Sequence, residues 1–305
     1  MATLRGPRPR RFTLSVRILP ERGGLVRATV NDKDGLEADG AWRHLLILVH
    51  GFNNAESEAT AKYKHYVESV LSLEARPSQV LPDAVADFHW PGNEAVGPFA
   101  IADVAGYPVD VERALDTVAP LATYLRRLIA ARPGARRISL VSHSLGCRVI
   151  LETMRRIGPA AGPPFAVVNL MAAAAPVALA EAGQALATAP MAATTLLKAH
   201  SRADWVLWLA FPAGQFAAWT LGFEAAAYGE AIGRHGNPPG FGDAVRREGN
   251  GHGDYWTDAV AAGAMLTAMD ATLRDLPAAT EIGGRDLVPS SAAETRSLPS
   301  RSLPS

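Results

Sequence analysis

The sequence feature that most constrains the fold is a short apolar run that passes through a sharp turn into a helix. The run covers residues 138–141, and an amphipathic helix is predicted over 145–157. Ser144 stands at the turn, and the small residues Ser142 and Gly146 lie two positions to either side. This spacing is typical of a nucleophile elbow, in which the backbones of strand and helix nearly touch and only small neighbours fit. Ser144 is therefore a candidate nucleophile; the alternative is that it simply caps the helix.

Strand-like and helix-like segments alternate along most of the chain. The predicted strands cover residues 12–19, 25–30, 45–49, 85–90, 138–141, 166–172 and 196–200, and the predicted helices cover 55–73, 110–131, 145–157 and 257–273. The first two strands flank Gly23 and Gly24, which predicts an antiparallel hairpin at one edge. Because strands that alternate with helices form parallel sheets, this order predicts an α/β fold with a mainly parallel sheet and helices on both faces.

The composition is typical of a globular protein with one large domain. The 305 residues are 48% hydrophobic and 20% charged, which allows a sizeable core. We expect this domain over residues 12–276, a disordered leader over 1–11, and a disordered tail over 277–305 that repeats Arg-Ser-Leu-Pro-Ser. Basic and acidic residues number 30 each, so no net charge attracts the chain to nucleic acid and no such partner is expected.

The chain contains one cysteine, Cys147, which excludes an intramolecular disulfide and a metal site made of cysteine pairs. No phosphate-binding glycine loop is visible, so we expect neither a cofactor nor a metal. The first residues contain no apolar stretch of signal-peptide length. The expected location is therefore the cytoplasm, with the periphery of a membrane as the alternative. Nothing in the sequence indicates an oligomeric state.

The loop after the predicted strand 45–49 begins with His50-Gly51-Phe52. In a fold with a nucleophile elbow, such a loop supplies one backbone N–H to the oxyanion, and the residue after the nucleophile supplies the other. We therefore expect the oxyanion hole to be formed by Phe52 and Leu145, with Gly51 allowing a close approach to the substrate. The alternative is a plain turn that ends the strand.

The acid and the base are expected after later strands, in the order Ser, then Asp or Glu, then His. Asp204 follows the run 196–200 and is the best acid candidate, although an Asp there also suits the N-cap of a helix. Glu181, in an Ala-rich helical stretch, is the runner-up. His252 lies on a Gly-rich loop before the last predicted helix and is the best base candidate, whereas His235, within an earlier loop, is its alternative.

Four other histidines end predicted strands and are expected to be polar residues at the rim of the sheet: His50, His89, His143 and His200. Because His143 is adjacent to Ser144, we also expect it to line the substrate site.

Residues 205–249 form a helical insertion between the predicted acid and base, and residues 205–223 carry no charge. One interpretation is a lid or acyl-binding wall in which Trp205, Trp208 and Phe211 contact the substrate. Another is a pair of core helices, and a transmembrane helix is disfavoured by the Pro and Gly residues within the segment. A lid predicts a hydrophobic, lipid-like ester and a transient contact with a membrane surface.

Taken together, these motifs resemble the α/β-hydrolase superfamily, and within it the bacterial alpha/beta hydrolases of unknown function that start with V-H-G-[FY]-N-N. The matching pieces, within roughly residues 44–273, are Leu48–Asn54, Trp90–Gly92, Tyr107, Asp110, Ser142–Gly146, Ser201–Asp204 and Gly251–Trp256. The resemblance implies a serine-hydrolase fold and an ester-type substrate, and no particular substrate.

The expected reaction is the hydrolysis of a small-molecule or lipid-like carboxylic ester by Ser144, Asp204 and His252. The same three residues would equally serve an amidase or a thioesterase. A hydrolase scaffold that binds without catalysing is the non-enzymatic alternative.

Overall fold

The computed structural model describes residues 9–20, 26–39, 41–52, 54–75, 79, 81–92, 100–131, 136–159, 162–225 and 229–274. The expected leader and tail lie outside these residues, apart from residues 9–11. Strand β1 begins at Arg10 and not at Phe12 as expected, so the end of the expected leader belongs to the sheet. The charge of Arg11 is compensated there by Asp87, whose carboxylate accepts two hydrogen bonds from the guanidinium.

The described strands form a single sheet in the order β2-β1-β4-β3-β5-β6-β7-β8. Their bounds are Arg10–Pro20 (β1), Val26–Asp32 (β2), His44–Val49 (β3), Ala84–His89 (β4), Arg137–His143 (β5), Phe165–Met171 (β6), Ala193–His200 (β7) and Asp243–Arg246 (β8). Strand β2 runs antiparallel to β1, and the other neighbouring strands are parallel. The predicted hairpin and mainly parallel sheet are confirmed.

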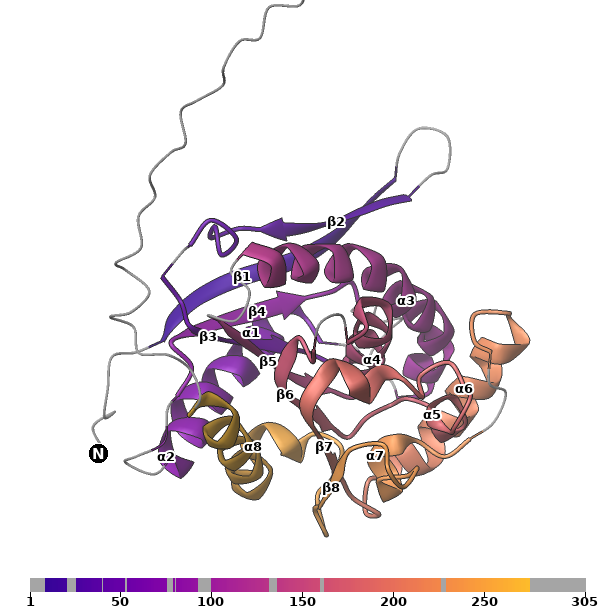
Figure 1. Ribbon diagram of the computed structural model, residues 1–305. Coiled ribbons are helices and arrows are strands. Elements are labelled where there is room, and N and C mark those ends of the chain that lie inside the picture. The colour runs from indigo at the N-terminus through magenta and orange to yellow at the C-terminus, as the bar shows by residue number, and fades with distance from the viewer. Residues whose placement is uncertain are drawn as a thin grey trace, which may run out of the picture.

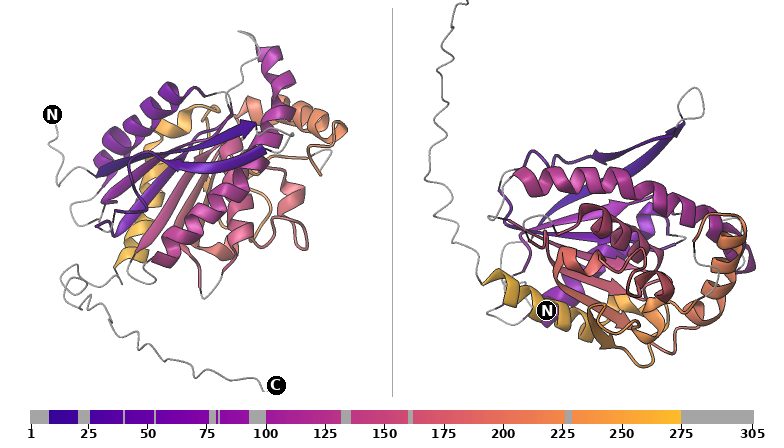
Figure 2. Two further views of the ribbon diagram at one scale, coloured as in Figure 1. Left: turned by 90° about the horizontal axis from the view of Figure 1, so that it is seen from above. Right: turned by 45° about the vertical axis from the view of Figure 1, so that its right-hand side comes forward.

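Helices cover both faces of the sheet (Figure 1). Their bounds are Glu56–His65 (α1), Tyr66–Leu71 (the π-helical η1), Ser72–Glu74 (α2), Ala100–Ala131 (α3), Leu145–Ile157 (α4), Val177–Ala180 (α5), Ala189–Ala192 (η2), Val206–Ala210 (the π-helical η3), Phe211–Thr220 (α6), Ile232–His235 (α7), Asp254–Thr257 (η4) and Ala259–Leu273 (α8). Helices α1 and α8 lie on one face, and α3 and α4 lie on the other (Figure 2). Every residue of β3, β4 and β6 is buried between these layers, which explains why their sequences are mostly apolar.

Strand β8 and helix α3 depart most from the sequence-based prediction. Strand β8 lies in the insertion predicted to be helical and pairs with β7 at the edge of the sheet. Its sequence Asp-Ala-Val-Arg is largely exposed, so no apolar run marks it as a strand. Helix α3 begins at Ala100 rather than at residue 110, and it contains Pro108 and Pro120. Proline usually interrupts a helix because it lacks the backbone N–H, so its presence hides the true length of α3.

The turn between β5 and α4 brings three segments into close contact. Ser144 has the unusual backbone angles φ 53° and ψ −125°. This conformation costs free energy and persists only where the surrounding structure holds it. Its N–H donates to the carbonyl of Met171 at 3.0 Å, and its carbonyl accepts from the N–H of Ala174 at 3.1 Å. A Cβ on Gly146 would lie 2.2 Å from the carbonyl oxygen of His50. Helix α4 therefore starts directly against the loop that follows β3.

This contact predicts that Gly146→Ala destabilises the protein although alanine is the better helix former. The added methyl group must displace backbone, which we expect to lower the free energy of unfolding by about 2 kcal/mol. Gly263→Ala in α8 is the matched control, because a Cβ there has no neighbour within 4 Å and should stabilise by about 1 kcal/mol. Urea denaturation of both variants measures the difference. Equal gains in stability for the two would contradict the close contact.

Buried His44, at the start of β3, predicts a dependence of stability on pH. Burial lowers the pKa of His44 to about 3, whereas an unfolded histidine titrates near 6.5. Between these values the unfolded chain binds the extra proton, so this group lowers the free energy of unfolding by up to about 1.4 kcal/mol per pH unit as the pH falls. Since glutamine does not titrate, the stability advantage of the wild type over His44→Gln should shrink between pH 6.5 and pH 4. A constant difference in urea titrations across this range would disprove it.

Candidate active site

The structure brings the three residues predicted as nucleophile, acid and base together at the carboxyl edge of the sheet. Ser144 lies between β5 and α4, Asp204 lies after β7, and His252 lies just before η4. The His252 Nε2 atom is 2.8 Å from Ser144 Oγ, and the His252 Nδ1 atom is 2.8 Å from Asp204 Oδ2. The imidazole thus connects the hydroxyl to the carboxylate through both of its nitrogen atoms.

The two carboxylate oxygens of Asp204 have separate partners. Its Oδ2 atom faces His252, and its Oδ1 atom accepts a hydrogen bond from the backbone N–H of Leu207 at 3.0 Å. Asp204 is fully buried, so its carboxylate is shielded from water. The helix-capping role and the histidine contact, which were alternatives at the level of sequence, are therefore compatible in one side chain.

His143 contacts His252 through both its ring and a hydrogen bond. Its Nε2 atom is 2.6 Å from the backbone carbonyl oxygen of His252, to which it donates, and the centroids of the two rings are 4.9 Å apart. Burial lowers the pKa of His143 well below its ordinary value, so its ring is neutral. His143 was predicted to line the substrate site because it precedes Ser144. The structure instead buries it against the backbone that carries His252.

Both predicted oxyanion donors belong to segments that contact Ser144. Leu145 is the first residue of α4, and an N–H in the first turn of a helix has no acceptor within that helix. The loop that carries Phe52 passes over the serine, because a Cβ on Gly51 would lie 2.7 Å from Ser144 Cβ. The two predicted donors therefore come from two different segments that meet at the serine.

Ser142 occupies the position where a nucleophile elbow usually has glycine. Its hydroxyl is buried and donates to Cys147 Sγ at 3.3 Å. Burial raises the pKa of the Cys147 thiol to about 12, so this cysteine stays protonated. The Cys147 thiol thus provides a hydrogen-bond acceptor for the Ser142 hydroxyl, which a glycine at this position would lack.

Aromatic side chains connect the loop after β3 with the insertion. The ring of Tyr107 in α3 lies 6.1 Å from the ring of Phe52 and 6.2 Å from the ring of Phe211, centroid to centroid. Phe211 is buried, whereas Trp205 is 56% exposed and Trp208 is 61% exposed. Of the three aromatic residues predicted to bind substrate, Phe211 therefore belongs to a buried cluster and the two tryptophans face outward.

A buried ion pair anchors the middle of the insertion. Arg148 in α4 donates to both carboxylate oxygens of Glu224, at 2.7 and 3.2 Å, and both side chains are buried. Helix α6 also packs against α3, where a Cβ on Gly214 would collide with the ring of Tyr107. The inner side of the segment is therefore part of the core, and its outer side is exposed. Within the described residues, no helix is long and apolar enough to cross a membrane.

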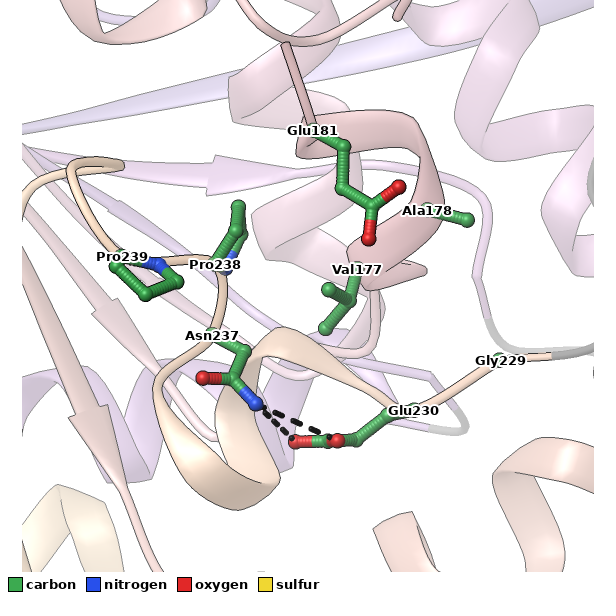
Figure 3. A pocket seen from close by; sticks show the side chains of 8 residues that line it. All are labelled: Val177, Ala178, Glu181, Gly229, Glu230, Asn237, Pro238 and Pro239. Atoms are coloured by element: carbon green, nitrogen blue, oxygen red, sulfur yellow. Dashed lines mark hydrogen bonds between the residues drawn. The ribbon is translucent and has the colours of Figure 1, made fainter.

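The two runner-up residues lie at a different place. Glu181 lines a pocket of about 430 Å³ together with Glu230 and Asn237, and the Nδ2 atom of Asn237 donates to the Glu230 carboxylate (Figure 3). His235 Nδ1 is 2.6 Å from Glu230 Oε1. Neither Ser144 nor His252 lines this pocket. Glu181 and His235 are thus not brought to the serine.

The contact between His50 and Trp90 was not predicted from the sequence. His50 was expected to be a polar residue at the rim of the sheet, but its imidazole is buried and contacts both Gly51 and Trp90. The motif Trp90-Pro91-Gly92 was noted only as part of the resemblance. The pairing of His50 with Trp90 depends on β3 and β4 being neighbours in the sheet, and no local pattern in the sequence indicates that.

The chain is distantly similar to several solved structures. TT1662 from Thermus thermophilus is 17% identical with a TM-score of 0.42, and the match covers 85% of this chain and 98% of that chain. A cold-adapted esterase from an Arctic intertidal metagenomic library is 15% identical, with coverages of 85% and 92% and a TM-score of 0.42. Acyl-protein thioesterase 2 of Zea mays is 15% identical, with coverages of 76% and 95% and a TM-score of 0.34. Identities this low carry no information about activity.

The family comparison is more direct. The chain has no match among curated proteins, but residues 33–211 match the family described as alpha/beta hydrolase of unknown function (DUF900). The matched region includes Ser144 and Asp204 and ends before His252. The protein therefore belongs to this family of alpha/beta hydrolases.

Proposed function

We propose that the protein is a serine hydrolase that cleaves a carboxylic ester through an acyl-enzyme on Ser144. The observation that carries this proposal is the hydrogen-bonded chain from Ser144 Oγ through His252 to Asp204, with 2.8 Å at each contact. The strained backbone of Ser144 at the start of α4 supports it, because this geometry exposes a nucleophile at a helix N-terminus.

In the first half of the proposed reaction, His252 Nε2 accepts the proton of the Ser144 hydroxyl as Oγ attacks the ester carbonyl. The buried Asp204 carboxylate accepts the His252 Nδ1–H and stabilises the imidazolium that forms. The negative charge moves to the carbonyl oxygen, where the N–H groups of Phe52 and Leu145 bind it. The carbon–oxygen bond of the ester then breaks, and His252 gives its proton to the departing alcohol.

In the second half, water replaces the alcohol. His252 removes a proton from the water as it attacks the acyl carbon, and the same two N–H groups bind the second oxyanion. Ser144 leaves with the proton from His252, the carboxylic acid is released, and the free enzyme is restored. One histidine therefore acts as base and then as acid in each half-reaction.

For the substrate, we propose an ester with an apolar acyl chain longer than acetyl. Phe52, Tyr107 and Phe211 form a continuous aromatic contact that starts at the loop carrying one oxyanion donor. Trp208 lies close to the proposed acid, because Arg234 lies over its ring and donates to the Asp204 carbonyl. The transient contact with a membrane surface stays a prediction.

An amidase or a thioesterase would use the same groups, since both form the same acyl-enzyme. A scaffold that only binds ligands is the non-enzymatic alternative. The labelling experiment below separates the enzyme from the scaffold, and rates with matched esters, amides and thioesters identify the preferred leaving group.

The nucleophile is tested by labelling with a fluorophosphonate probe, which reacts with activated serines. We expect the wild type to label, Ser144→Ala to lose labelling, and His252→Ala and Asp204→Asn to label about 10²-fold more slowly or worse. Ser142→Ala is the matched control, because it removes a buried hydroxyl two positions away and should still label. A wild type that does not label, or a Ser144→Ala variant that does, would contradict the proposal.

The acyl preference is tested with p-nitrophenyl esters of increasing chain length. We expect kcat/KM to rise beyond acetyl, and Trp208→Ala to lower it about tenfold for long chains while leaving the acetate rate unchanged, because the large apolar surface is lost. Trp219→Ala is the matched control. Trp219 is also exposed but lies near the end of α6, and its replacement should leave both rates unchanged. If acetate is the best substrate, the proposed chain length is wrong.

A further inference from the structure

His50 is a buried side chain that the proposed reaction leaves without a role. It follows β3 and is 2% exposed. Its Nδ1 atom lies 2.8 Å from the carbonyl oxygen of Gly51, and its Nε2 atom lies 3.2 Å from the backbone nitrogen of Trp90. The ring thus connects the loop after β3 to the end of β4.

These two partners determine the tautomer of His50. The backbone N–H of Trp90 can only donate, so Nε2 must carry a lone pair and accept. The proton of the neutral ring is then on Nδ1, which donates to the Gly51 carbonyl. Burial lowers the pKa of His50 to about 4, so the ring is neutral around pH 7 and this arrangement is maintained.

The carbonyl that His50 binds belongs to the same peptide unit as the Phe52 N–H. A trans peptide is planar, and its C=O and N–H point in opposite directions. Fixing the Gly51 carbonyl toward His50 therefore directs the Phe52 N–H away from it. Gly51 itself lies against the proposed nucleophile, because a Cβ there would be 2.7 Å from Ser144 Cβ.

Trp90 holds the imidazole in place from a second direction. Its indole ring stacks on His50 with centroids 5.5 Å apart and planes 11° apart. Its indole N–H also donates to the His50 carbonyl at 2.8 Å. His50 therefore has little freedom to rotate away from Gly51.

Asn54 binds the same loop from its other end. Its Nδ2 atom donates to the Phe52 carbonyl at 2.8 Å and contacts the Gly51 carbonyl at 3.4 Å. Lys62 in turn donates to Asn54 Oδ1. Both carbonyls around the Phe52 N–H are thus held, and the strongest direct contact to the Gly51 carbonyl is that of His50.

We propose that His50 is a positioning residue that directs the Phe52 N–H toward the oxyanion by binding the Gly51 carbonyl. This inference rests on the proposed function, because it assigns His50 to the oxyanion hole of that reaction. Without the His50 hydrogen bond, only the longer 3.4 Å contact from Asn54 holds the Gly51 carbonyl, so the Gly51–Phe52 peptide can rotate and its N–H is lost from the transition state. Removing one oxyanion donor costs about 10²-fold or more in kcat.

Two substitutions separate positioning from general packing. The side-chain amide of asparagine ends near the position of histidine Nδ1, and that of glutamine ends near Nε2. His50→Asn can therefore still donate to Gly51, whereas His50→Gln turns its amide toward Trp90. We expect kcat to fall about 10²-fold in His50→Gln with KM nearly unchanged, and less than tenfold in His50→Asn.

The inhibition constant of an alkyl boronic acid reports on the oxyanion hole and does not change with a general packing defect. Its tetrahedral adduct places an oxygen in the oxyanion hole, so Ki should rise in His50→Gln by the same factor as kcat/KM falls. The rates are expressed per active site, titrated with the fluorophosphonate, and thermal unfolding of each variant is measured in parallel. His44→Gln is the matched control, since His44 is equally buried at the start of the strand that His50 follows, and its kcat should be unchanged.

The outcomes distinguish this inference from the proposed function. If the wild type fails to label, the proposed function fails. If the wild type labels but His50→Gln keeps its kcat and Ki, the positioning role of His50 is overturned. The same holds if His50→Asn loses as much activity as His50→Gln, or if His44→Gln loses activity to the same extent.

Discussion

The site depends on one close contact between three backbone segments. The end of β3, the turn at Ser144 and the first residues of α4 meet where Gly146 lies against the His50 carbonyl. The positive φ of Ser144 is maintained by hydrogen bonds to Met171, the last residue of β6, and to Ala174 in the loop that follows. Because these segments cannot move apart independently, the hydroxyl, the helix N-terminus and the loop of Phe52 have fixed relative positions, as catalysis by preorganised dipoles requires.

Three histidines near this contact have different surroundings and different tasks. The imidazole of His252 bridges Ser144 and Asp204 and is positioned to exchange protons. His143 and His50 are buried and neutral, and each donates to a backbone carbonyl, of His252 in one case and of Gly51 in the other. Burial thus converts two titratable side chains into fixed hydrogen-bond donors that hold the backbone around the proposed reaction.

The sequence predicted the sheet and the residues that the structure brings together, because both depend on local patterns and on chain order. The run into Ser144, the glycine-rich loop of His252 and the apolar strand before His50 can each be identified from the sequence. Strand β8 could not be predicted, since its exposed residues carry no apolar pattern. The pairing of His50 with Trp90 depends on strand order, and the outward direction of Trp208 depends on how η3 packs. These are tertiary features, which local patterns do not determine.

The central claim is that an acyl group becomes covalently attached to Ser144. The most direct measurement is acid quenching of the enzyme during turnover of a p-nitrophenyl ester, followed by trypsin digestion and peptide mass spectrometry. The account predicts an added acyl mass on the peptide of residues 138–148, with fragment ions that assign it to Ser144 and not to Ser139, Ser142 or Cys147. Ester turnover with no adduct, or with the adduct on another residue, would contradict it.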